Sequence, residues 1–245
     1  MSGHSKWNNI KRKKEKTDGQ KAKIFTKVGR EIGVAVREGG GDPNVNGKLR
    51  DLIAKAKSLN VPNDNIMRII KRAEGGEKEN YESITYEGYG PCGIAMMVET
   101  LTDNRNRTAA NLRHYFDKFG GNLGNMGCVS FLFTEKGVIV LDGEGLDEEK
   151  VMEDCFDAGA DDFDMGDDVV EVTCSPDSFS DVRQKLEEKG YTFISAEVEM
   201  VPSTTTPITD PDAQAQMAKL LDALDDDDDV QNVWHNLENE EDLDR

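Results

Sequence analysis

The chain has 245 residues, of which 36% are hydrophobic and 32% are charged, and its formal net charge is −19. This length predicts two or three compact units, and the apolar periodicity that recurs along the chain excludes outright disorder. No apolar run approaches the roughly 18 residues that span a membrane, and the start lacks the apolar stretch of a signal peptide, so we expect a cytoplasmic protein with reduced cysteines.

The charge is divided unevenly along the chain. Residues 1–75 hold 18 Lys and Arg against 8 Asp and Glu, whereas residues 76–245 hold 12 against 41. A cationic segment attracts polyanions such as phosphate backbones, and an acidic body limits indiscriminate coating. The pattern predicts a nucleic-acid-binding protein with a polarised surface.

The N-terminal part of the sequence predicts a small helical domain that begins with a basic arm over residues 2–16. A helix over about 20–38 follows, and three glycines at 39–41 stop it. A second helix ends near Asn60. A third helix, capped by Asn63 or Asp64, buries an isoleucine face and stops at Gly75-Gly76.

After the helical part, the apolar period changes to about 2, which is typical of strands. Residues 82–86 and 93–101 predict a hairpin around a turn at 88–91. A helix capped by Thr102 or Asp103 is expected to run to Phe119, with an apolar stripe formed by Leu112, Tyr115, Phe116 and Phe119. A strand near 128–133 follows.

Residues 137–200 predict a self-contained βαββαβ unit in the ferredoxin-like order. Its elements are expected, in order, at 138–141, 147–157, 161–163, 169–173, 178–189 and 192–199. A later helix over 210–224 and a strand over 230–236 would complete the earlier ββαβ segment. The sequence therefore predicts an α+β multidomain chain with a three-helix domain over 1–77, a middle α+β domain over 78–136 plus 201–245, and an inserted ferredoxin-like domain over 137–200.

Seven short motifs occur together along almost the whole chain. They are GHSKW at 3–7, KIFTK at 23–27, GGGDP at 39–43, YEGYGP at 86–91, TDNRNRT at 102–108, GGNLG at 120–124 and DDVQNVWHN at 228–236. In this combination the chain resembles the YebC/PmpR family, which itself resembles the mitochondrial translational activator of cytochrome c oxidase. Cys92 stands where the family pattern leads us to expect glycine.

The resemblance implies a helical first domain and two further α+β domains around a central cleft. It also implies a role in gene expression, since bacterial members are described as probable transcriptional regulators and other members act in translation at the ribosome.

The basic arm is the first candidate for nucleic-acid contact, because its lysines can meet phosphates and Trp7 can stack on a base. The alternative is a solvated tail with Trp7 packed on the first helix. Contact is favoured because Glu15 alone offsets the cations between Lys6 and Lys16. The candidates in the arm and the first helix are Lys6, Trp7, Lys11, Arg12, Lys13, Lys14, Lys16, Lys21, Lys23 and Lys27.

In the third helix, Arg68, Lys71 and Arg72 lie opposite the isoleucine face and form a possible cationic stripe. An ordinary solvated face is an equally good interpretation. The first residues of this helix are uncharged or acidic, so they support reading of base edges only weakly.

The run Asn104, Arg105, Asn106 and Arg107 is the main basic spot within an acidic region. It falls in the first turn of a helix, where backbone donors and two arginines could clamp a phosphate. The alternative is a structural role in which the arginines pair with nearby carboxylates.

Other patterns carry no catalytic or metal chemistry. The glycine-rich loop over 120–127 follows a helix and lacks the ending of a P-loop. The acidic runs at 161–168 and 225–229 do not fit an EF-hand and are interpreted as solvated loops. The cysteines and histidines are scattered without a metal or nucleophile spacing, so we expect no metal, no cofactor and no enzyme activity.

The leading hypothesis is a non-enzymatic nucleic-acid-binding regulator of gene expression. A translation factor that docks on ribosomal RNA is the competing hypothesis, and it gains weight because no dimerisation heptad is apparent. A protein adaptor whose acidic body binds a basic partner is the third. The expected partner is thus DNA or ribosomal RNA, with the ribosome as a further candidate, and we expect no membrane and no small-molecule substrate.

Overall fold

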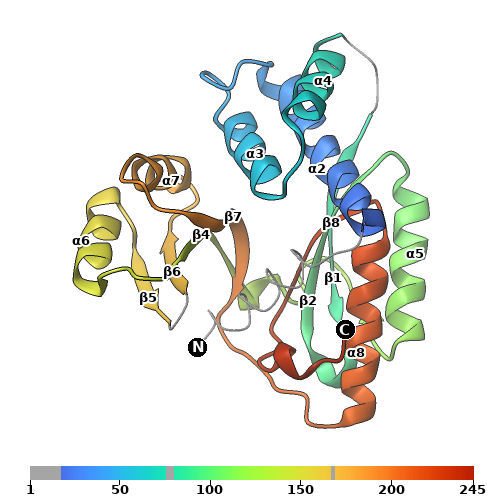
Figure 1. Ribbon diagram of the computed structural model, residues 1–245. Helices are drawn as coiled ribbons and strands as arrows, with labels where there is room; N and C mark the ends of the chain where they lie inside the picture. Colours follow the sequence, from blue (N-terminus) through green and yellow to red (C-terminus); the bar gives the residue numbers. More distant parts are fainter. Residues whose placement is uncertain (1–17, 76–79, 167–168) are drawn as a thin grey trace. The chain divides into compact units, whose positions relative to one another are not determined.

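The computed structural model of the protein describes residues 18–75, 80–166 and 169–245 (Figure 1). The helices are α2 (Asp18–Gly39), α3 (Gly47–Ser58), α4 (Asn63–Glu74), α5 (Arg105–Lys118), α6 (Glu148–Ala158), α7 (Phe179–Glu188) and α8 (Pro211–Asp226). The strands are β1 (Glu82–Tyr89), β2 (Ala95–Thr102), β3 (Asn122–Leu123), β4 (Phe133–Asp142), β5 (Asp162–Met165), β6 (Val169–Cys174), β7 (Phe193–Pro202) and β8 (Val230–His235).

This order confirms the predicted fold class, in which a three-helix segment precedes two α+β units, one inserted in the other. Spatial contacts divide the described residues into two compact units. One unit combines residues 32–75 with the second sheet, and the other combines residues 22–31 with the first sheet. The domain boundaries at 77, 136 and 200 remain a prediction. No helix among the described residues is long and apolar enough to cross a membrane.

The junction between α2 and α3 is built around the buried Asn46. Its side-chain oxygen accepts a hydrogen bond from the Leu49 backbone N–H at 3.0 Å, and its amide nitrogen donates to the carbonyl oxygens of Ala35 and Gly40 at 2.9 and 2.8 Å. Gly40, the residue that follows the last residue of α2, has a φ of +84°, a conformation that glycine adopts without strain. The expected glycine stop is therefore confirmed.

Helix α4 buries Ile66 and Ile70, as its periodicity predicts. A fully buried isoleucine contributes about 1.5–3 kcal/mol relative to an exposed one. The prediction of an Asn63 or Asp64 cap is wrong, because Asn63 is already the first helical residue. Pro62 occupies the cap position with an extended backbone, at φ −59° and ψ 137°.

The first sheet has the order β3-β1-β2-β8. Its strands β1, β2 and β8 are labelled in Figure 1. Strands β1 and β2 form the expected hairpin, but the ladder continues to the Tyr89↔Ala95 pair, so the turn lies at 90–94 and not at 88–91. Strand β8 follows the inserted segment in the sequence, and it completes this sheet by pairing antiparallel with β2. Helices α5 and α8 contact each other and share its core, which includes the fully buried Leu112, Phe116 and Met217.

Two local predictions in this unit are wrong. Helix α5 is capped by Asn104, whose backbone is non-helical at φ −145° and ψ 87°, whereas Thr102 is the last residue of β2. The strand expected near 128–133 is a short 3-10 turn, Ser130–Leu132, before β4. The Glu87 carboxylate accepts hydrogen bonds from the backbone N–H groups of Val129 and Ser130, so these donors cannot join a ladder.

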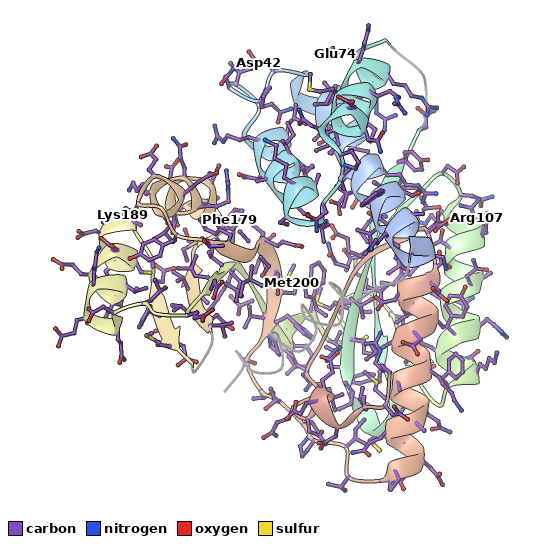
Figure 2. All side chains as sticks on the ribbon, in the orientation of Figure 1. Asp42, Glu74, Arg107, Phe179, Lys189 and Met200 are labelled. Carbon is purple, nitrogen blue, oxygen red and sulfur yellow. The ribbon has the colours of Figure 1, made fainter. Side chains whose placement is uncertain are left out.

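The second sheet has the order β5-β6-β4-β7, which is the ferredoxin-like arrangement predicted from the sequence. Helices α6 and α7 pack on it over a core that contains Ile139, Leu141 and Phe179. Figure 2 labels Phe179. Within the same compact unit, the buried Arg183 donates from Nε to the Asp51 carboxylate at 3.2 Å.

Candidate nucleic-acid interface

The basic arm lies outside the described residues, so its candidate contacts remain predictions. These candidates are Lys6, Trp7, Lys11, Arg12, Lys13, Lys14 and Lys16.

The lysines of α2 approach the acidic segment over 225–229 at the end of α8. Lys23 Nζ lies 2.8 Å from the Asp226 carboxylate, and Lys27 Nζ donates to the backbone oxygen of Asp225 at 2.8 Å. Lys21 is exposed near the start of the helix. Lys23 and Lys27 therefore already have anionic or carbonyl partners within the protein, which a phosphate would have to replace.

Helix α4 carries the cationic stripe where the sequence predicts it. Arg68, Lys71 and Arg72 are exposed, and they lie on the side of the helix away from the buried Ile66 and Ile70. The acidic residue of the first turn, Asp64, is also exposed. The stripe thus faces solvent, and its binding of nucleic acid stays a prediction.

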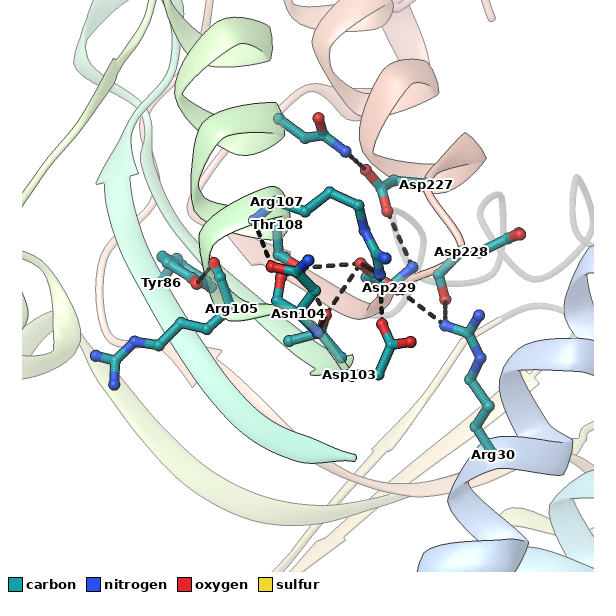
Figure 3. Close-up of polar contacts among 12 residues, drawn as sticks. Arg30, Tyr86, Asp103, Asn104, Arg105, Arg107, Thr108, Asp227, Asp228 and Asp229 are labelled. Carbon is teal, nitrogen blue, oxygen red and sulfur yellow. Dashed lines mark hydrogen bonds and ion pairs between the residues drawn. The ribbon is translucent and has the colours of Figure 1, made fainter. Parts of the chain in front are cut away.

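In the run over 104–107 at the start of α5, two side chains make structural contacts and two are exposed. The Asn104 side chain accepts from the Arg107 backbone N–H at 3.1 Å and caps the helix. Arg107 Nη2 donates to the Asp103 and Asp229 carboxylates, at 2.7 Å in both cases (Figure 3). Arg105 and Asn106 remain exposed. Their part in a phosphate clamp stays a prediction, whereas Arg107 has the carboxylate partners that the structural alternative anticipates.

Asp229 is the centre of this cluster, and its burial corrects the interpretation of 225–229 as a solvated loop. Only 4% of the residue is exposed. Its carboxylate accepts hydrogen bonds from the hydroxyls of Thr102 and Thr108 at 3.1 and 2.9 Å, as well as from Arg107. Arg30 of α2 reaches its other oxygen at 3.1 Å (Figure 3).

Burial by itself would raise the pKa of the Asp229 carboxyl. The hydrogen bonds from Arg107 and Thr108 and the positive charge of Arg107 outweigh that effect, so the pKa lies below its ordinary value. The hydrogen bonds to Asp229 and Asp103 raise the pKa of Arg107. The Asp229 carboxyl group is therefore ionised at neutral pH.

Sequence reasoning missed Arg30 and Asp229 as parts of one cluster. Arg30 donates to the Asp228 backbone oxygen at 2.6 Å, and its guanidinium lies 5.2 Å from the centre of the Tyr81 ring. Nothing in the spacing of these residues signals that they meet. The only signal in these segments is the presence of family motifs. KIFTK at 23–27 lies shortly before Arg30, and DDVQNVWHN at 228–236 includes Asp229.

The described residues hold no group of three or more His, Cys, Asp or Glu side chains arranged to bind a metal ion. All four cysteines are free thiols. Burial raises the pKa of the Cys155 thiol to about 11, so it stays protonated at neutral pH.

Comparison with known proteins places the chain in a family. Residues 5–76 match the TACO1/YebC protein N-terminal domain, and residues 81–237 match the TACO1/YebC second and third domain. A probable transcriptional regulatory protein of Acetivibrio thermocellus is 58% identical over 238 residues, covering 96% of this chain and 98% of the relative. One of Ruminiclostridium cellulolyticum is 59% identical over 243 residues, covering 98% of each.

A solved structure supports the same assignment. The crystal structure of the conserved hypothetical protein Aq1575 from Aquifex aeolicus is 43% identical to this chain and superimposes with a TM-score of 0.81, covering 91% of this chain and 92% of that one. On the two domain matches, the relatives and this shared fold, the chain belongs to the TACO1/YebC family.

Proposed function

We propose that this protein is a non-enzymatic regulator of gene expression that acts in the cytoplasm by binding nucleic acid. The relatives named as probable transcriptional regulatory proteins support the regulatory role. The observation that carries the binding role is the exposed cationic stripe of Arg68, Lys71 and Arg72 on α4, within a segment that is positively charged although the whole chain is at −19.

The stripe favours nucleic acid for an electrostatic reason. A phosphate backbone releases its condensed counterions when lysines and arginines neutralise it, and this release drives binding. The acidic remainder of the chain repels the same backbone, so the phosphate contacts fall mainly on the cationic part. The polar groups at the start of α4 include Asp64, which favours contact with phosphates over reading of base edges.

The test compares the full chain with an Arg68→Gln/Lys71→Gln double variant in binding to duplex DNA and duplex RNA over a range of salt concentrations. Loss of two phosphate contacts should weaken binding and reduce the slope of log affinity against log salt by about 2. The matched control is Lys150→Gln/Lys219→Gln, which removes two exposed lysines from the acidic part of the chain.

An unchanged salt slope in the Arg68/Lys71 variant, or an equal loss in the control, contradicts the proposal. Crosslinking the protein in cells and sequencing all bound DNA and RNA then identifies the class of nucleic acid that it binds.

A further inference from the structure

Residues 122–131 comprise the short edge strand β3 (Asn122–Leu123) and the turn that follows it, and together they are called the loop over 122–131. A buried carboxylate holds the shape of this loop. Glu87 of β1 is 5% exposed and accepts hydrogen bonds from the backbone N–H groups of Gly127, Val129 and Ser130 at 2.8, 2.8 and 2.9 Å. The Tyr89 hydroxyl donates to the Cys128 backbone oxygen at 3.0 Å. Four fixed points thus define the path of the loop.

The inner side of this loop is buried against the first sheet. Val129 and Phe133 are buried against Ala95 and Met97 of β2. A Cβ atom added at Gly124 would lie 2.5 Å from the Cys128 sulfur, so only glycine fits there without displacement. The loop is therefore preorganised, which lowers the entropic cost of binding a ligand.

The outer side is exposed and uncharged. Met126 is 87% exposed and Phe131 is 73% exposed, which makes them two of the three most exposed large apolar side chains among the described residues. Asn122 and Asn125 are exposed. Residues 120–134 include no charged side chain, although 32% of the whole chain is charged.

These features fit a nucleobase better than a folded protein partner. A stable protein interface buries roughly 800 Å² on each side, which two apolar side chains cannot supply. A base needs much less, since one aromatic face stacks on it and one or two amides meet its edge. The uncharged stretch over 120–134 also matters, because carboxylates within it would repel the phosphates on either side of the base.

We propose that the loop over 122–131 binds an unpaired base of a single-stranded segment, with the base stacked on Phe131 and its edge available to the amides of Asn122 and Asn125. This inference rests on the proposed function, because it assumes a nucleic-acid ligand. It adds a second contact, selective for unpaired nucleotides, to the phosphate contacts of α4.

The experiment uses the full chain and two RNA probes with equal numbers of phosphates, namely a hairpin with 2-aminopurine in its single-stranded loop and a fully paired duplex. The wild-type protein should quench the 2-aminopurine fluorescence on binding. Phe131→Ala should abolish the quenching and weaken hairpin binding by about five- to tenfold, with duplex binding unchanged. Phe131→Tyr should behave as the wild type, and Phe131→Leu as the alanine variant.

The matched control is Phe156→Ala, which removes a 50% exposed phenylalanine from α6 and should leave both probes unaffected. If Phe131→Leu retains full hairpin binding, or if Phe131→Ala binds both probes as well as the wild type, the loop does not stack a base. Either result overturns this inference and leaves the proposed function standing. If the wild-type protein binds neither probe at low salt, the proposed function fails together with it.

Discussion

Arg107 Nη2 lies 2.7 Å from the Asp229 carboxylate, yet the two side chains differ greatly in exposure, at 46% for the arginine and 5% for the aspartate. Water can solvate the arginine if the pair is broken, but it reaches the carboxylate poorly. The cost of losing the pair therefore falls on Asp229, because a buried charge without its partner is destabilising.

We predict that Arg107→Gln lowers the free energy of unfolding by about 1–3 kcal/mol, since it leaves the buried carboxylate with weaker donors. Urea denaturation measures the change. Arg105→Gln is the control, because the Arg105–Glu82 pair is 3.8 Å apart and exposed on both sides, so its loss should change stability by less than about 0.5 kcal/mol. Equal effects of the two substitutions would show that Asp229 does not depend on Arg107.

The depressed pKa of Asp229 predicts a pH dependence of stability. A carboxyl group with a lower pKa in the folded state contributes stability above its unfolded value, about 3.9, and that contribution is lost as the pH falls through the folded value. The stability advantage of the wild-type protein over Asp229→Asn should therefore be constant near pH 7 and shrink below about pH 4. Urea denaturation at several pH values measures it, and an advantage that grows on acidification would refute the assignment.

The hairpin turn contains a residue in a conformation that favours glycine. Cys92 has a φ of 57° and a ψ of 20°, and it is exposed. A side chain in this left-handed region costs about 1–2 kcal/mol, part of which the greater entropy of unfolded glycine offsets. We predict that Cys92→Gly stabilises the protein by up to about 1 kcal/mol and raises the melting temperature by about 2–4 °C. Gly93→Ala, at a φ of +76°, should do the reverse in the same calorimetric measurement.

Periodicity in the sequence was enough to predict most of the fold. The alternation of apolar residues predicts β4, β6 and β7, and the 3.6-residue period predicts the buried face of α5, because both patterns reflect which side chains the core takes up. The residue that caps α5 was harder to predict from the sequence. Thr102, Asp103 and Asn104 can all cap a helix, and the choice depends on Thr102 being the last residue of β2 and bonded to Asp229.

The candidate site could be predicted only in part, for a similar reason. Arg68 and Lys71 are exposed as expected, because a helix face opposite buried isoleucines must face solvent. The burial of Asp229 could not be read from five consecutive aspartates, since its partners Arg107 and Arg30 lie 122 and 199 residues away in the sequence. Long-range pairs of this kind leave no periodic signal.

The contact between Lys23 and Asp226 predicts that the protein restrains its own affinity for nucleic acid. The Lys23 ammonium lies 2.8 Å from the Asp226 carboxylate, with exposed fractions of 42% and 67%. A phosphate that binds Lys23 must displace this carboxylate and tolerate its repulsion at close range. Asp226→Asn removes the charge while it keeps the size of the side chain, so we expect about two- to threefold tighter binding to duplex DNA or RNA at low salt.

The matched control for this variant is Asp212→Asn, which makes the same charge change in the first turn of α8, at the opposite end of the helix from Asp226. Binding isotherms at two salt concentrations distinguish a local effect from a general one. Net charge alone would make the two variants bind equally well, whereas competition at Lys23 makes Asp226→Asn the tighter binder, and the difference should shrink as salt screens the exposed pair. A Lys23→Gln/Asp226→Asn double variant completes the argument, because without Lys23 the loss of the carboxylate should no longer raise the affinity beyond the gain in the control.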